Sequence, residues 1–100
     1  MGKSRPVQKG GATGRSRYSE AELDLHARTV EEAIPMVESF LNDAYLRGLQ
    51  RVRIIHGKGT GKLKLEVDRF LARNSLVTGR SPADSSHGGN GATEVEISGK

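Results

Sequence analysis

The stretch RVRIIHGKGTGKLKLEV, residues 51–67, constrains the fold more than any other part of this 100-residue sequence. It begins with β-branched residues, passes through glycines at every second position, and continues with apolar residues at helical spacing. This order is typical of a strand that leads through a tight loop into a helix. The loop can be a turn that needs glycine, a cradle for phosphate, or the floor of an active site.

The rest of the chain predicts a strand and a helix before this stretch and two strands after it. Alternating leucines predict a strand within 21–27. The capping-box motif TVEE, which begins at Thr29, predicts a helix as far as Leu46, and Pro35 inside it predicts a kink or a lost hydrogen bond. The other predicted elements are a strand at 51–56, a helix that ends near Asn74, and strands at 76–78 and 93–97.

This order, strand-helix-strand-helix-strand-strand, predicts an α/β fold: a two-layer sandwich with a small mixed four-stranded sheet. Each strand–helix–strand connection should be right-handed and should join parallel neighbours, so both helices are expected on one face of the sheet. The other face should be more open. We expect a flexible basic arm or linker at 1–20, one domain at 21–98 and a tail at 99–100.

The charge of the chain is unevenly distributed. Residues 1–20 hold five of the 16 basic side chains and one of the 12 acidic ones, which leaves 11 of each for the rest. Residues 44–65 contain six basic side chains and no acid, which predicts a local positive field around the glycines. The absence of cysteine excludes a disulfide framework and a thiolate metal site. Without a membrane-spanning apolar run or a signal peptide, we expect no membrane partner and a cytoplasmic location.

Ionisable side chains follow the two strands that are predicted to be parallel. Asp24 and His26 close the first strand and should project to the same face, about 6.6 Å apart along it. His56 closes the second strand just before the glycines. Because ligands collect at the carboxyl ends of parallel strands, these three are candidate site residues. A half-exposed strand or a hydrogen-bonded structural histidine would also explain them. A metal site built from all three is a weaker alternative, since their spacing matches no ligand motif.

The glycine loop has the composition of an anion site, although simple turn chemistry explains it equally well. Glycines let the backbone approach a ligand, and the next helix N-terminus and several lysines attract anions. The Gly-x-Gly-x-Gly spacing fits neither the Walker loop nor the dinucleotide fingerprint, so we do not expect nucleotide hydrolysis. His87, in a Ser/Gly-rich loop, is interpreted as a surface residue. The predicted nucleic-acid-binding residues are Gly57, Lys58, Gly59, Thr60, Gly61, Lys62, Lys64 and Arg53.

Three segments, LDLHARTVEEAI, RIIHGKGTGKLK and GGNGATEVEI, occur in an order and spacing that resemble the Smr (small MutS-related) domain over residues 22–97. The likeness is greatest to the Smr domain at the C-terminus of the recombination-suppressing bacterial MutS paralogue. Residues 23–26 match the family's Leu-Asp-Leu-His/Arg motif, and residues 56–59 match its His-Gly-Lys-Gly motif. Ala27 departs from the pattern, because many members have Gly there. The resemblance implies a sandwich that binds nucleic acid and often acts as an endonuclease.

We therefore expect a nucleic-acid-binding domain that nicks branched DNA or cleaves structured or ribosome-associated RNA, in recombination control or ribosome quality control. The glycine loop would hold a backbone phosphate, and Asp24 and His26 would position or activate the attacking oxygen. His56 would act as general acid or orient the loop. The alternatives are a DNA- or RNA-binding module without catalysis, and a module that docks on the ribosome or another protein through its basic arm.

The expected partner is the phosphate backbone of DNA or RNA, because the chain has only four aromatic residues for base stacking. The expected reaction requires no cofactor, and a divalent metal is left open. If the chain is a fragment, an upstream MutS-like ATPase region is a further expected partner. The sequence does not decide the oligomeric state.

Overall fold

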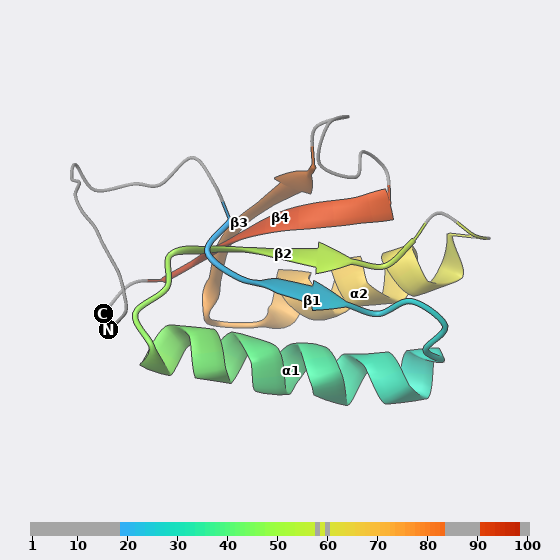
Figure 1. The fold of residues 1–100 in the computed structure, drawn as a ribbon, viewed down its shortest axis with the longest axis horizontal. Coiled ribbons are helices and arrows are strands. Elements are labelled where there is room, and N and C mark those ends of the chain that lie inside the picture. The colour runs from blue at the N-terminus through green and yellow to red at the C-terminus, as the bar shows by residue number, and fades with distance from the viewer. Residues whose placement is uncertain (1–18, 58, 60, 84–90, 99–100) are drawn as a thin grey trace.

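Figure 1 shows a computed structural model of the chain, in which residues 19–57, 59, 61–83 and 91–98 are described. The predicted basic arm lies outside the described residues except for its last two positions, and so do His87 and the tail. The elements are β1 (Glu22–Asp24), α1 (Val30–Leu46), β2 (Arg51–Ile55), α2 (Lys62–Arg73), β3 (Val77–Pro82) and β4 (Ala92–Ile97). Their order and type confirm the predicted α/β fold.

The four strands form one mixed sheet in the order β1-β2-β4-β3. β1 and β2 are parallel, and β4 runs antiparallel to both β2 and β3. The prediction that each helical connection joins parallel neighbours is therefore correct for β1 and β2 and wrong for β2 and β3, which β4 separates. β4 is buried along nearly its whole length, whereas β3 is largely exposed and carries a register shift. Burial favours the central position for β4, and exposure suits β3 to the edge.

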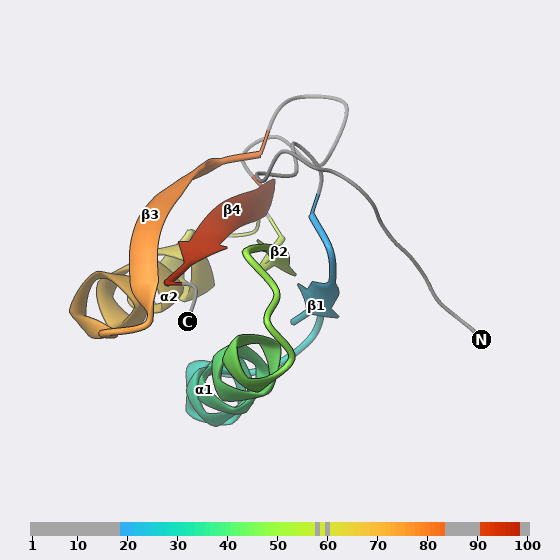
Figure 2. The same cartoon turned by 90° about the vertical axis from the view of Figure 1, so that its left-hand side faces the viewer.

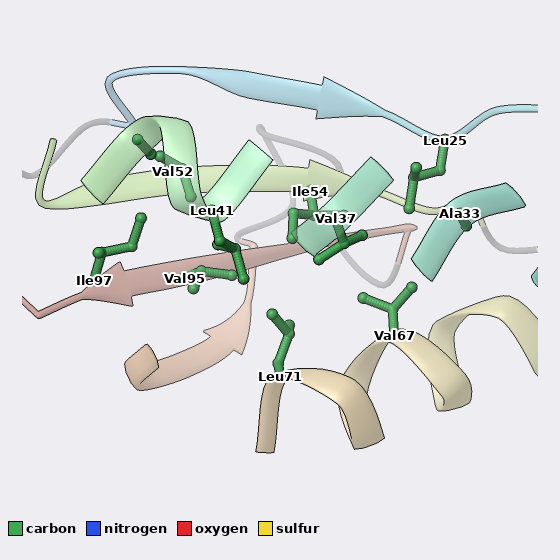
Figure 3. Close-up of a cluster of buried hydrophobic side chains, with 11 residues drawn as sticks. Leu25, Ala33, Val37, Leu41, Val52, Ile54, Val67, Leu71, Val95 and Ile97 are labelled. Carbon is green, nitrogen blue, oxygen red and sulfur yellow. The ribbon is translucent and has the colours of Figure 1, made fainter. Parts of the chain in front are cut away.

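Both helices cover the same face of the sheet, as predicted, and the core lies between the two layers (Figures 1 and 2). Val52 and Ile54 of β2 are fully buried and point into this core, while Arg51, Arg53 and Ile55 alternate with them on the other face. Figure 3 shows the central residues. The buried cluster consists of Leu25, Ala33, Val37, Leu41, Ala44, Val52, Ile54, Val67, Leu71, Val95 and Ile97.

The ends of α1 follow from local sequence. Thr29 Oγ1 accepts a hydrogen bond from the Glu32 backbone N–H at 3.1 Å, and Glu32 Oε1 accepts one from the Thr29 N–H at 3.0 Å. This is the predicted capping box. Gly48 follows the helix with a φ of 76°, a conformation that favours glycine. α1 continues through the exposed Pro35, which has no N–H to donate to the Glu31 carbonyl. In the described part of the chain, no helix is long and apolar enough to span a membrane.

The sheet face away from the helices carries a network of ion pairs. Arg53 Nε donates to Glu94 Oε2 at 2.8 Å, and Arg53 also pairs with Glu22. Arg51 NH1 lies 3.3 Å from Glu96 Oε2. Acids from β1 and β4 thus neutralise arginines of β2, and the positive field predicted from residues 44–65 is wrong for this part of it. An acid-free stretch of sequence does not reveal acids that neighbouring strands supply.

The chain joins this sheet face two residues before the predicted domain start. The Glu20 N–H donates to the Arg51 carbonyl at 2.7 Å, and Glu20 Oε1 accepts from the Gln50 N–H at 2.6 Å. The Ser19 hydroxyl donates to the Glu94 carboxylate. Burial alone would raise the pKa of Glu94, but the hydrogen bonds from Ser19 and Arg53 outweigh it and lower that pKa below its usual value.

Candidate nucleic-acid site at the strand ends

The carboxyl ends of β1 and β2 meet at one edge of the molecule, on the right in Figure 1, where the glycine loop leads into α2. The Leu25 N–H donates to the Ile55 carbonyl at 2.7 Å, so the segment that contains β1 remains paired with β2 as far as the last residue of β2. The side chain of Leu25 is fully buried and anchors this edge in the core. The two predicted motifs, one after each strand, are therefore brought to the same edge.

Asp24 and His26 are both exposed, and the Asp24 carboxylate shapes the turn between them. Asp24 Oδ1 accepts a hydrogen bond from the backbone N–H of His26 at 2.9 Å. β1 ends at Asp24, and the chain turns at His26 and Ala27. The predicted strand is thus too long, and strand alternation does not set the direction of His26. Instead, an aspartate caps the turn that follows β1, and the exposed His26 lies in this turn, at the edge where β1 and β2 end together.

Ala27 has a φ of 63°, in the left-handed region. Among the described residues it is the one non-glycine residue with a positive φ. A Cβ in this region is crowded by the backbone, at a cost of about 1–2 kcal/mol. Glycine, which the resemblance leads us to expect at this position, would avoid this strain. The departure noted in the sequence therefore keeps the turn and adds strain to it.

His56 is buried, with 6% of its surface exposed, and both of its ring nitrogens are engaged. Nδ1 lies 3.0 Å from the Gly57 carbonyl, which can only accept, so Nδ1 carries the proton. Nε2 lies 2.9 Å from Thr93 Oγ1 and accepts a hydrogen bond from that hydroxyl. Burial lowers the pKa of His56, and the nearby positive charge of Lys64 adds to the effect. This neutral, locked ring fits the predicted role of orienting the loop better than that of a general acid.

Gly91, the residue before β4, holds the start of the glycine loop through its backbone carbonyl. The Gly91 carbonyl accepts from the His56 N–H at 3.0 Å and from the Gly57 N–H at 2.9 Å. Gly91 and Thr93 were not among the predicted site residues. The available signal is the segment GGNGATEVEI, the third motif of the resemblance, whose local pattern predicts only a loop and a strand. All three motifs meet at this edge.

Gly57, Gly59 and Gly61 all have positive φ angles, of 78°, 23° and 85°. A Cβ at any of them would meet no described atom within 4 Å, so conformation rather than space requires glycine. Gly61 is also the N-cap of α2 and offers no side chain to the first N–H groups. The first turn of α2 contains Lys62 and Lys64 and no acid. These features suit an anion, while Lys58 and Thr60 lie outside the described residues.

Arg53, the remaining predicted ligand, is placed differently from the loop. It lies on the open sheet face, is held by Glu94 and Glu22, and has 13% of its side chain exposed. Its role in binding nucleic acid stays a prediction, and its pairing within the sheet counts against that role. No three described His, Asp or Glu side chains are grouped to hold a metal ion, so Asp24, His26 and His56 do not form the weaker metal-site alternative.

Comparison with known proteins gives consistent relatives. The family model of the Smr domain matches residues 23–98. Endonuclease MutS2 of Carboxydothermus hydrogenoformans is 47% identical over 76 residues, which cover 76% of this chain and 10% of that protein. Endonuclease MutS2 of Symbiobacterium thermophilum is 42% identical over 89 residues, which cover 89% of this chain and 11% of that protein. The chain spans about a tenth of the length of these relatives.

Two solved structures share the fold. The crystal structure of the Smr domain of Thermus thermophilus MutS2 has a TM-score of 0.77 and 37% identity, and the match covers 78% of this chain and 98% of that one. The crystal structure of YdaL, a stand-alone small MutS-related protein from Escherichia coli, has a TM-score of 0.72 and 38% identity. This match covers 76% of this chain and 63% of that one. Sequence and structure agree, and this chain belongs to the Smr domain family.

Proposed function

We propose that this domain binds the phosphate backbone of nucleic acid and cleaves it as an endonuclease, by nicking branched DNA or cutting structured or ribosome-associated RNA. The observation that carries the proposal is the edge where the exposed Asp24–His26 turn adjoins the glycine loop and the acid-free start of α2. The name endonuclease, given to the MutS2 relatives, supports the same reading. Recombination control or ribosome quality control is the proposed setting.

In the proposed reaction, backbone N–H groups of the loop and the charges of Lys62 and Lys64 hold a phosphate. The exposed His26 imidazole accepts the proton of the attacking oxygen, and Asp24 keeps the turn that presents it. As the new O–P bond forms, the P–O bond to the leaving oxygen breaks, and that oxygen takes up a proton from solvent water, while protonated His26 returns its proton to solvent. His56, locked between Gly57 and Thr93, keeps the loop in place.

The products distinguish the two nucleophiles. If the 2′-hydroxyl of RNA attacks, cleavage leaves a 2′,3′-cyclic phosphate and a 5′-hydroxyl, and no metal is needed. DNA has no 2′-hydroxyl, so water or another activated group must attack it, and attack by water leaves one phosphate monoester and one hydroxyl. Analysis of the product ends, with and without chelator, therefore identifies the nucleophile and tests for a divalent metal.

Three substitutions test the site. His26→Gln should lower the cleavage rate by about 10²–10⁴-fold, the range for a lost proton-transfer group, while binding remains. Asp24→Asn keeps an oxygen for the His26 N–H and removes the charge, whereas Asp24→Ala removes both. If only Asp24→Ala impairs cleavage, Asp24 acts through the turn rather than on the substrate. Asp43→Asn, an exposed carboxylate at the far end of α1, is the control.

A non-catalytic binding module is the second candidate function, and one observation favours it. His56 has no nitrogen left for proton transfer and Asp24 is used by the backbone, so His26 is the one proposed proton acceptor at this edge. A parent protein that binds but never cuts either DNA or RNA supports this alternative. Docking on a ribosome or protein through the basic arm is a separate possibility, which deletion of residues 1–18 tests through ribosome association.

A further inference from the structure

A nucleic acid held at the glycine loop can extend from it over the open sheet face or along the helix layer. The open sheet face offers two arginines, Arg51 and Arg53, but three carboxylates already pair with them. These carboxylates belong to Glu22, Glu94 and Glu96. A phosphate chain on this face would compete with the acids for both arginines and would meet a net negative charge. The sheet face is therefore a poor path for a polyanion.

The outward side of α2 has the opposite character. Lys62, Arg69 and Arg73 are exposed and follow each other at intervals of seven and four residues, so they lie in one row along the helix. Val67 and Leu71 on the opposite side are buried in the core. Arg73 forms no ion pair with any described residue, and its guanidinium lies in the last turn. We call Lys62, Arg69 and Arg73 the α2 row.

One acid, Glu66, lies in the same row and reduces the net positive charge of the row. Glu66 is four residues after Lys62 and three before Arg69, and its Oε2 lies 3.2 Å from Arg69 NH1. The side chain of Arg69 is still 59% exposed, so this pair is screened by water and is readily exchanged for a phosphate. The row therefore keeps a net positive charge in the presence of Glu66.

The neighbouring helix shows that this charge is specific to α2. α1 and α2 contact each other in the same layer. Within Val30–Leu46 there are four acidic side chains and no lysine or arginine, and all four acids are exposed. They are Glu31, Glu32, Glu38 and Asp43. The helix layer is thus divided into an acidic half over α1 and a basic half over α2, and the basic half begins at the glycine loop.

We propose that the α2 row continues the phosphate-binding site, so that the nucleic acid leaves the glycine loop along α2 and avoids both the open sheet face and α1. The inference rests on the proposed function, because it assigns the path of the same ligand. From Lys62 to Arg73 the helix rises about 16 Å. At about 3.4 Å per nucleotide of a duplex strand, the row spans about five nucleotides beyond the loop.

The test is the salt dependence of binding, measured with short labelled single-stranded, duplex and branched oligonucleotides. The Arg69→Gln/Arg73→Gln double variant removes two phosphate contacts. The slope of log K against log salt should become shallower by about 1.8 for duplex and about 1.4 for single strands. Arg47→Gln is a matched control, since Arg47 is 61% exposed and has one ion pair, with Asp43 at 3.3 Å, but lies at the C-cap of α1. It should leave the slope unchanged.

A gain of binding provides an independent check. Glu66→Gln removes the acid from the α2 row and should tighten binding several-fold at low salt, whereas Glu38→Gln on α1 should not. If the double variant and Glu66→Gln both behave like their α1 controls while the parent binds and cuts, the proposed path is overturned and the proposed function stands. If the parent binds none of the three oligonucleotides, the proposed function and the path fail together.

Discussion

Ala27 holds a turn that glycine would hold with less strain. Its φ of 63° costs an L-residue free energy that glycine avoids. We predict that Ala27→Gly raises the free energy of unfolding by about 1 kcal/mol, measured by urea denaturation. Ala72→Gly, at an exposed position of α2, is the control and should lower it by up to about 1 kcal/mol. If Ala27→Gly destabilises the domain as Ala72→Gly does, Ala27 does not have the strained, left-handed conformation.

His56 makes the stability of the domain depend on pH. Burial lowers the pKa of His56 in the folded state, whereas the unfolded chain has a value of about 6.5. Between these two values the unfolded state binds more protons, so the free energy of unfolding should fall as the pH falls from about 6.5. When the free energy of unfolding, measured by urea denaturation, is plotted against pH over this range, it should rise more steeply with pH for the parent than for His56→Gln. Equal slopes would contradict the buried, neutral ring.

At the residue scale, sequence could predict what depends on near neighbours. The capping box needs only residues three apart, so Thr29 and Glu32 could be paired from the sequence. The partner of His56 is Thr93, 37 residues away, and nothing local indicates it. For that reason the sequence predicts neither the burial of His56 nor which of two roles, acid catalysis or loop orientation, it takes.

At the scale of elements, β4 links the two halves of the sheet and supplies the carboxylate at the centre of the ion-pair network. Glu94 has 11% of its side chain exposed and contacts Arg53, Arg51 and Ser19. We predict that Glu94→Gln lowers the free energy of unfolding by about 3 kcal/mol, because it leaves arginines without a buried partner. The estimate is at the low end for buried pairs, since Arg53 keeps Glu22.

A matched exposed pair provides the control for this prediction. Asp43 and Arg47 are 63% and 61% exposed, and exposed pairs contribute little in water. Asp43→Asn should change the free energy of unfolding by about 0.5 kcal/mol or less in the same denaturation experiment. If the two substitutions have equal effects, the sheet network is no more than a surface feature.

The position of β4 also shows where prediction of elements reached its limit. The order and type of all six elements could be predicted, because strand alternation and helical spacing are local patterns. The insertion of β4 between β2 and β3 could not, because it depends on which strand buries most surface in the finished sheet. The predicted ends of β1 and β3 differ by a few residues from those in the structure, for a related reason. Turns such as the one capped by Asp24 end a strand without an apolar signal.

At the scale of the whole molecule, the fold sorts charge that the sequence leaves mixed. The acid-free stretch at 44–65 predicted one positive region, but the folded chain pairs Arg51 and Arg53 with acids of other strands. On α2, exposed basic side chains lie at the start and along the outside of the helix, at Lys62, Arg69 and Arg73. The edge of the sheet that holds the three family motifs is therefore also the start of the basic half of the helix layer.

The most direct test of the account is an amide chemical-shift titration of the parent domain with a phosphorothioate oligonucleotide that resists cleavage. We predict saturable shifts for the N–H groups of Gly59 and Gly61, because the phosphate is held by the loop backbone, whereas the Gly57 N–H already donates to the Gly91 carbonyl. The N–H groups of Arg51 and Glu96, on the open sheet face, should not move. Shifts confined to the sheet face, or no shift in the glycine loop at saturating oligonucleotide, would contradict a nucleic-acid site at the strand ends.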